Sequence, residues 1–490
     1  MTADEAEAAV LSMADDVDAF AISGLFSVST PGQEEEVRAA VERLSGKPTV
    51  LGHTLTTELG IMERTVTAVL NARLLPIISE FLHGVQAALE VEGFHGRVLV
   101  FKGDGGLMDI STAILRPVET VLSGPAASLM GASALNQLPD CLAIDIGGTS
   151  TDIAFLDEGF PRLSPEGAVV GQWRTRVKAV DMWTCGLGGD SHVRLDKKEG
   201  MVVGPERVVP LCVACARFEG LLERARATPE VNYYFAVRDS PHLKGDERRV
   251  MDHLLAAGPS SFFETMDCAK DALFVNDSLL GLKSKGLALM TGITPTDAMQ
   301  VLHLHEAGNA EAAKFAVSFL GEKMDLPLER MAETILGDVS DRMAEEIAKK
   351  AVTDAGGDLP AGKGFSLLLR SAATAGTLGG MKLQAKLDRP IIGIGAPAGL
   401  LVTPLEKRMG CRVVIPEGHE VGNAVGAVCS MISESVAVKV YPHGDDGFYV
   451  YPPSSEPFHY AYLDQAKSAA RSTAERYATD RVRANGAEDI

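Results

Sequence analysis

The chain has 490 residues, of which 46% are apolar and 23% are charged, as is usual for a globular protein. Its 66 acidic residues outnumber 46 basic ones, and the formal net charge of −20 disfavours general binding to nucleic acids or anionic membranes. The seven cysteines are scattered and the N-terminus is acidic, so we expect a cytoplasmic protein without disulfides or a secretory signal. No run of 18 uninterrupted apolar residues occurs, so no membrane span is expected.

The first part of the sequence alternates between amphipathic stretches and short apolar runs, which is typical of α/β proteins. The spacing of apolar residues predicts helices over 1–20, 33–44 and 62–91. Short apolar runs predict strands within 19–26 and 97–101.

Later segments continue this alternation around a central hairpin. β-branched runs on either side of a Gly-Gly turn predict two paired strands within 141–156. Residues 295–358 are expected to be helical, and strands return at 390–394 and 411–415.

From these elements we expect five segments of distinct character. They are a partial N-terminal lobe with helices (1–135), a phosphate-loop core (136–215), a mixed insertion (216–300), a helical segment with the nucleotide side of the core (301–440) and a small C-terminal β/α element (441–490).

The turn of the central hairpin is the most informative part of the sequence. Its glycines and hydroxyl side chains suit the close binding of an anion by backbone N–H groups, and these residues are Gly147, Gly148, Thr149, Ser150 and Thr151. Asp145 and Asp152 flank the turn, where carboxylates can hold Mg²⁺ or orient a water molecule. The alternative is a hairpin with a purely structural role, whose polar side chains bind no ligand.

This octapeptide resembles the phosphate loop of the actin, sugar-kinase and Hsp70 superfamily, and the wider sequence resembles the hydantoinase A and 5-oxoprolinase family. The further matching blocks follow the family's order along nearly the whole chain. They are Glu63-Arg64-Thr65, Lys102-Gly103-Asp104-Gly105-Gly106, Leu122-Ser123-Gly124-Pro125-Ala126, Thr294-Pro295-Thr296-Asp297, Ile394-Gly395-Ala396-Pro397 and Glu420-Val421-Gly422-Asn423-Ala424.

The resemblance implies an actin-like, ribonuclease H-like ATPase fold with inserted helical and mixed segments. It also implies an enzyme that uses ATP and Mg²⁺ to open a cyclic amide, of the hydantoin or 5-oxoproline type, by phosphorylating the amide oxygen. Asp145, Asp152 and Asp181 are the expected catalytic carboxylates. Some members of the family are instead subunits of ATP-dependent carboxylases, so this function remains an alternative.

Two further expectations follow from the resemblance. Gly393 and Gly395 belong to a strand and turn that would pack against the adenosine part of the nucleotide. The family commonly works with a second, B-type subunit, so we expect a homo-oligomer or a hetero-oligomer.

The sequence departs from the family pattern in its number of phosphate hairpins. The superfamily uses two, whereas only one Asp-x-Gly-Gly-Thr-x-x-Asp hairpin is present, so we expect the first lobe to be incomplete. The first hairpin would be missing through truncation, supplied by another chain, or lost together with catalysis. A non-catalytic or split subunit is therefore a third possibility.

A second departure concerns a metal site. Trp183 stands near a position where many relatives have a histidine, and Trp cannot bind a metal. Asp181, His192 and Asp104, or Asp152 in place of Asp104, are candidate ligands for Zn²⁺ or Mn²⁺. The alternative is that His192 is an ordinary hydrogen-bonded residue beside a loop.

Other features have simpler interpretations. Cys212 and Cys215 form a lone CxxC pair, which we interpret as buried small residues. His303 and His305 are expected on a helix without a special role. The small residues of 422–427 are expected to pack on the sheet, and 464–485 is expected to be a solvated charged helix.

Overall fold

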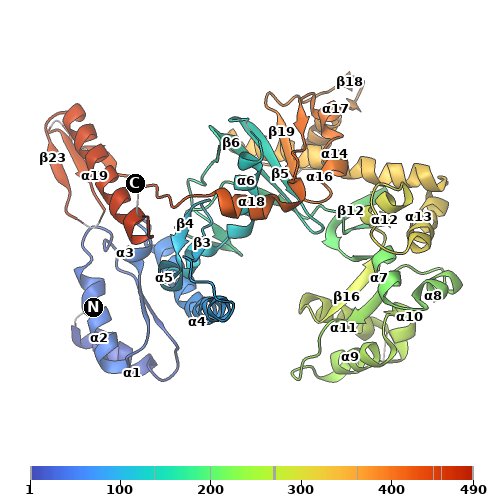
Figure 1. Ribbon diagram of the computed structural model, residues 1–490, viewed down its shortest axis with the longest axis horizontal. Helices are drawn as coiled ribbons and strands as arrows, with labels where there is room; N and C mark the ends of the chain where they lie inside the picture. The colour runs from blue at the N-terminus through green and yellow to red at the C-terminus, as the bar shows by residue number, and fades with distance from the viewer. Residues whose placement is uncertain are drawn as a thin grey trace. The chain divides into compact units, whose positions relative to one another are not determined.

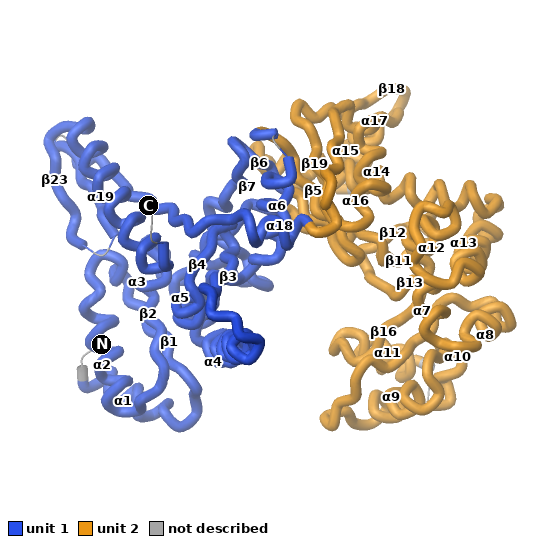
Figure 2. The backbone as a smooth tube through the Cα atoms, viewed as in Figure 1, with its two compact units in different colours: residues 1–139, 154–182, 422–490 blue, residues 140–153, 183–421 orange. Residues whose placement is uncertain are grey.

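The computed structural model describes residues 3–136, 138–198, 200–268, 272–360, 362–444, 446–453 and 455–487. The chain forms two compact units from interleaved segments (Figure 2). Unit 1 consists of residues 1–139, 154–182 and 422–490, and unit 2 consists of residues 140–153 and 183–421. Helices and strands alternate in both, so the predicted α/β class is confirmed. The division into five segments stays a prediction.

Unit 2 contains the first strand and the turn of the predicted hairpin, whose two strands lie at the centre of a sheet (Figure 1). β5 (Cys141–Ile146) is fully apolar in its first four residues and pairs in parallel with β19 (Ile391–Ile394), which in turn pairs with β20 (Val413–Val414). β6 (Thr151–Asp157) follows β5 and pairs with β10 (Trp183–Cys185). The continuous burial of β5 and β6 is typical of strands that are covered on both faces.

The remainder of unit 2 combines a β-hairpin, a smaller mixed sheet and several helices. The strands are β11 (Ser191–Asp196), β12 (Gly200–Arg207), β13 (Val209–Pro210), β14 (Tyr233–Ala236), β15 (Ser260–Ser261), β16 (Ala288–Gly292), β17 (Thr377–Leu378) and β18 (Met381–Lys382). The helices are α7 (Leu211–Arg217), α8 (Leu221–Ala227), α9 (Gly245–Ala257), α10 (Phe262–Thr265), η2 (Met266–Cys268), α11 (Ala272–Ser284), α12 (Pro295–Val301), α13 (Ala310–Met324), α14 (Leu328–Asp354), α15 (Lys363–Ala373), α16 (Ala398–Leu401), α17 (Leu405–Met409) and η3 (His419–Val421).

The predicted helix over 295–358 is divided into α12, α13 and α14, so the expectation about the two histidines is wrong. His303 lies after the end of α12 with a left-handed backbone (φ +56°), and His305 lies in the loop that leads to α13. The capping box of Thr294 and Asp297 starts α12 as the sequence predicts.

Unit 1 contains longer helices and several small sheets. Its helices are α1 (Ala3–Met13), α2 (Gly32–Ser45), α3 (Gly52–Leu55), α4 (Ile61–Val91), α5 (Ile110–Leu115), η1 (Pro117–Thr120), α6 (Ser123–Ala134), α18 (Gly422–Cys429) and α19 (Leu463–Ala484). Its strands are β1 (Phe20–Ile22), β2 (Thr49–Leu51), β3 (Leu99–Phe101), β4 (Leu107–Asp109), β7 (Phe160–Pro161), β8 (Val169–Val170), β9 (Trp173–Arg174), β21 (Lys439–Pro442), β22 (Phe448–Tyr451) and β23 (Phe458–Tyr460).

The helix α18 packs on α6, not on the sheet as its small residues led us to expect. A Cβ atom added at Gly131 of α6 would overlap the carbonyl oxygen of Gly422, and one added at Gly426 of α18 would overlap that of Ala127. The two helices therefore approach backbone to backbone.

Among the described residues, α4 has the length and composition to cross a bilayer, with an 18-residue window of mean hydropathy 1.3. However, polar residues of α4 are buried against the rest of unit 1. The Asn71 side chain donates to the Leu115 carbonyl and accepts from the Val118 N–H, and Arg64 is fully buried. Of the apolar window itself, 22% is buried, and one helix of this kind is weak evidence for a membrane span.

Candidate functional site

The candidate site begins at the turn between β5 and β6. The Gly147 N–H donates to the Ser150 carbonyl at 3.0 Å, which closes the turn. Gly148 and Thr149 are exposed at its tip, whereas β5 before them is buried. The backbone at the tip is thus available to a ligand.

A second loop, residues 186–191, supports this turn through backbone hydrogen bonds; we name it the glycine loop. The N–H groups of Gly189 and Asp190 donate to the carbonyls of Gly147 and Gly148 at 3.1 and 2.7 Å. A Cβ atom at Gly188 would lie 2.5 Å from the Gly147 carbonyl oxygen, so a larger residue would push the two loops apart.

Thr296 links the glycine loop to the first turn of α12. Its backbone N–H and its hydroxyl both donate to the Gly189 carbonyl, at 2.9 and 2.8 Å. Asp297 beside it is fully buried and accepts from the Cys212 N–H at 2.9 Å, which ties α12 to α7. The position of the glycine loop is therefore set by buried contacts.

The loop after β19 approaches the same hairpin from the other neighbouring strand. Register pairs Ile394 with Asp145, so Gly395 follows directly beside that carboxylate. Gly395 has φ +94°, and an added Cβ atom would overlap the Ile146 carbonyl oxygen and lie 3.0 Å from Asp145 Oδ1. Only glycine fits at this position, which explains the second glycine of the Gly-x-Gly pattern.

These loops enclose a cavity of about 380 Å³, which we name the hairpin cavity. Its size lies within the roughly 300–1,000 Å³ typical of sites for drug-sized ligands. It is lined by Gly148, Gly189, Asp190, Val213, Thr296, Met299, His305, Glu306, Ala307, Ala396, Pro397 and Leu400. The phosphate hairpin and the loop after β19, which are far apart in the sequence, thus line one cavity.

Residues 64–216 match the hydantoinase/oxoprolinase family. The acetophenone carboxylase gamma subunit of Aromatoleum aromaticum is 31% identical over 198 residues, covering 38% of this chain and 27% of the relative. Caprolactamase subunit alpha of Pseudomonas jessenii is 30% identical over 195 residues, covering 39% of this chain and 28% of the relative.

The fold is similar to that of solved relatives over a longer stretch. The crystal structure of the ATP-dependent caprolactamase from Pseudomonas jessenii has a TM-score of 0.63 at 21% identity, covering 99% of this chain and 57% of the caprolactamase chain. The sequence matches thus span just over a quarter of these two curated relatives, and the fold match just over half of the solved chain. The family resemblance predicted from the sequence is confirmed.

Two hairpin residues that the sequence marked as candidates, Asp152 and Thr151, are buried and hydrogen-bonded. Asp152 is buried and accepts from the Thr184 hydroxyl at 2.6 Å. Burial raises the pKa of Asp152, and the nearby charge of Asp145 adds to the effect. Thr151 is fully buried and its hydroxyl donates to the Leu187 carbonyl at 2.7 Å, so it supports the glycine loop.

The candidate metal ligands are not gathered into a site. No group of three or more His, Cys, Asp or Glu side chains in the described ranges is arranged to hold a metal ion. His192, in unit 2, is buried with Nδ1 3.3 Å from Glu206 Oε2, and burial lowers its pKa. Asp104 and Asp181 belong to unit 1, where Asp104 accepts from Lys102 Nζ at 3.1 Å. The Trp183 indole donates to Glu346 at 2.8 Å.

Sequence reasoning missed the contributions of Asp190 and Thr296. Asp190 is paired with Arg207 at 3.1 Å, yet burial raises its pKa despite that partner. The sequence around Thr296 is explained by the capping of α12 by Thr294 and Asp297. No neighbouring residue therefore indicated that Thr296 would bind the glycine loop. The cysteine pair is buried on α7 as predicted, and burial raises the pKa of Cys215 to about 12.

Proposed function

We propose that the chain carries the nucleotide site of an ATP-dependent hydrolase that opens a cyclic amide. The observation that carries this proposal is the hairpin cavity, in which an exposed two-glycine turn faces the loop after β19. The caprolactamase whose fold it shares is ATP-dependent and acts on a lactam by name, which supports both parts of the proposal.

The residues present fit a nucleotide with Mg²⁺. Backbone groups at Gly148 and Thr149 are accessible to phosphate oxygens, and small residues at Ala396 and Pro397 leave room for the flat adenine and its ribose. Asp145, beside Gly395, is the carboxylate that would hold Mg²⁺, which usually takes only one or two protein carboxylates together with phosphate oxygens. The described residues do not offer the ligand set that Zn²⁺ requires.

The chemistry explains why ATP is needed. Resonance makes an amide carbonyl a poor electrophile, and ATP supplies a phosphoryl group that activates the amide oxygen. Asp152 is buried and accepts from the Thr184 hydroxyl, so we assign Asp152 to positioning the hairpin. Asp145 lies beside Gly395, next to the loop that lines the cavity, so we assign Asp145 to the phosphate side.

A carboxylase subunit is the alternative, because the acetophenone carboxylase gamma subunit is as similar to this chain as caprolactamase subunit alpha. Both of these relatives are subunits by name, so we propose that this chain also works with a second, B-type subunit. Light scattering on the complex isolated from the native source would contradict this if it gave the mass of one chain.

The deciding experiment measures ATP hydrolysis by that native complex with hydantoins, 5-oxoproline and caprolactam, and separately with ketones and labelled bicarbonate. We expect lactam- or hydantoin-dependent turnover, which Asp145→Asn lowers on the order of 100-fold because a charge-stabilising group is lost. Asp358→Asn, an exposed control, should retain full activity. Label incorporation would favour the carboxylase, and no ATP turnover with any substrate would indicate a non-catalytic subunit.

A further inference from the structure

The outer side of helix α4, at the edge of unit 1 (Figure 2), carries a row of mainly apolar side chains; we name it the α4 stripe. Its positions recur every three or four residues, so they lie on one face of the helix. They are Met62, Val66, Val69, Arg73, Ile77, Glu80, Gly84, Ala87 and Val91. All except the half-buried Val66 are exposed, with Ile77 at 61% and Val91 at 85%. An apolar row of this length on a protein surface indicates an interaction site.

The spacing of the α4 stripe is the same when the helix is read in either direction. Reversal about the bond between Pro76 and Ile77 exchanges position 62 with 91, 66 with 87, 69 with 84 and 73 with 80. Two antiparallel copies of a helix that are related by a two-fold axis require this symmetry, because each residue of one copy then faces its reversed counterpart in the other. The pattern therefore fits a second copy of α4, whereas an unrelated partner would not require it.

The two charged residues of the stripe, Arg73 and Glu80, determine the direction of this pairing. Both are exposed, and neither has an ion-pair partner within the part of the chain that the structure describes. Antiparallel pairing places Arg73 of each copy opposite Glu80 of the other, so two ion pairs form. Parallel pairing would place like charges opposite each other, which is unfavourable.

Side-chain size is complementary in the same arrangement. Val69 meets Gly84 of the second copy. Val66, one turn earlier, meets the second copy's Ala87. A Cβ atom added at Gly84 would meet nothing within 4 Å, so the surface at this position is open to a neighbouring side chain. Small residues opposite larger ones let two helices approach closely, as in the contact of α6 with α18.

We propose that two copies of the chain associate through the α4 stripe as an antiparallel, two-fold symmetric pair. The 31 residues of α4 make the helix about 46 Å long. A contact along a single pair of helices is at the low end of interface sizes, so we expect a reversible dimer with a Kd on the order of 10 µM. This inference does not depend on the proposed function, and it leaves the rest of the surface available to a second, B-type subunit.

Sedimentation velocity of the full chain and its charge variants tests the proposal. We expect the wild type to dimerise, and Arg73→Glu or Glu80→Arg alone to raise the Kd on the order of 100-fold, because each creates two like-charge contacts. The double variant should dimerise within about threefold of the wild type, because it recreates both opposite-charge pairs. An equimolar mixture of the two single variants should do the same, since one copy then carries two acidic residues and the other two basic ones.

A steric variant and a control complete the test. Gly84→Leu fills the space that Val69 of the second copy requires, so it should raise the Kd about 10-fold without lowering the Tm. Arg471→Glu reverses an exposed charge on α19 and should leave the Kd unchanged.

Three results would overturn the proposal. They are a wild type that stays monomeric at about 100 µM, charge variants that neither the double variant nor the mixture rescues, and assignment of the stripe to another partner. Release of the second subunit from the native complex by Arg73→Glu, or flotation of the chain with phosphatidylglycerol vesicles, would make that assignment.

Discussion

At the scale of single residues, Glu434 shows how the chain tolerates a buried carboxylate. It is 2% exposed, and it accepts from Lys102 Nζ at 3.0 Å and from the Asn485 side chain at 2.7 Å. Burial alone would raise the pKa of Glu434, but the positive charges of Lys102, Arg481 and Lys178 outweigh burial and leave it lowered from 4.5. The ionised form is therefore the one that the fold stabilises.

Replacing this carboxylate should have a large, pH-dependent effect on stability. Glu434→Gln leaves the buried Lys102 ammonium with one paired carboxylate, that of Asp104, and the Ser433 carbonyl, so we expect a loss of about 3 kcal/mol in the free energy of unfolding near pH 7. Because the folded pKa is lowered, the wild-type advantage is complete above pH 4.5 and declines as the pH falls below it. Urea unfolding between pH 3 and 7 measures both effects.

The control for this prediction is Glu475→Gln, which neutralises an exposed carboxylate on α19 and should change stability by less than about 0.5 kcal/mol. A loss at Glu434→Gln that matched the control, or one that was constant across this pH range, would show that the ion pairs do not stabilise the fold.

At the scale of elements, the contact of α6 with α18 gives the same substitution different effects at two sites. Glycine inside a helix normally costs about 1 kcal/mol relative to alanine. Gly124→Ala adds a methyl group that meets nothing within 4 Å apart from its chain neighbours, so only contact with the Pro125 ring opposes it and the loss should stay below about 1 kcal/mol. Gly131→Ala forces that methyl group into the backbone of α18, and we expect a loss of about 1–3 kcal/mol.

Thermal unfolding of the two variants tests this prediction directly, because both variants replace a glycine of α6 by alanine. Equal shifts in Tm would mean that the two helices are not in backbone contact.

The elements that could be predicted from sequence are those set by local patterns. The hairpin around Gly147 and Gly148 and the start of α12 at Thr294 depend on neighbours within a few residues, and both are confirmed. The partners of Thr296, Gly131 and Arg481 are Gly189, Gly422 and Glu119. They were not foreseen, because each lies more than a hundred residues away in the sequence. The helix that contains Arg481 exposes a charged face, as its sequence predicts. The spacing of its charged residues did not indicate that one of its arginines lines a cavity.

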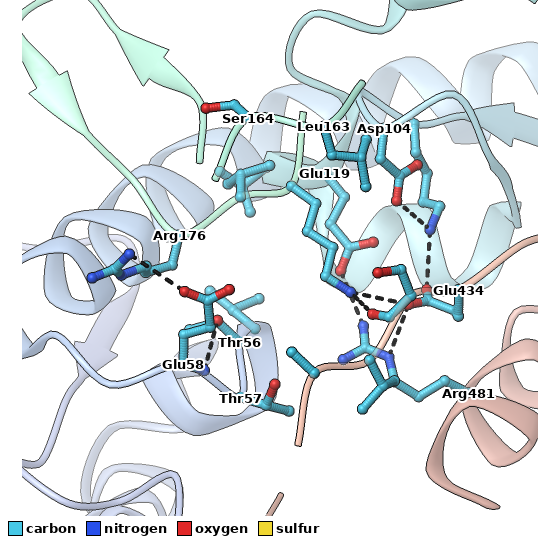
Figure 3. A pocket seen from close by; sticks show the side chains of 18 of the residues that line it. Thr56, Thr57, Glu58, Asp104, Glu119, Leu163, Ser164, Arg176, Glu434 and Arg481 are labelled. Carbon is cyan, nitrogen blue, oxygen red and sulfur yellow. Dashed lines mark hydrogen bonds and ion pairs between the residues drawn. The ribbon is translucent and has the colours of Figure 1, made fainter. Parts of the chain in front are cut away.

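At the scale of the whole molecule, the two units contain cavities of different chemistry. The hairpin cavity belongs to unit 2 and is built from backbone turns and small residues, whereas a cavity of about 190 Å³ in unit 1 is lined by charged side chains, Arg481 among them (Figure 3). The strand β6 runs through both units, since its first three residues belong to unit 2 and its last four to unit 1. If the nucleotide binds in the hairpin cavity, it should protect segments of unit 2.

Hydrogen exchange followed by mass spectrometry measures that separation. Saturating MgATP should slow exchange at 145–151, 186–191 and 394–400, and at 100 times its Kd it should add about 2.7 kcal/mol to the free energy of unfolding of unit 2. We expect Asp145→Asn to lose this protection and Asp358→Asn to keep it. Protection of 434–441 by MgATP, with none at the hairpin, would place the nucleotide in unit 1 and contradict the assignment of the hairpin cavity.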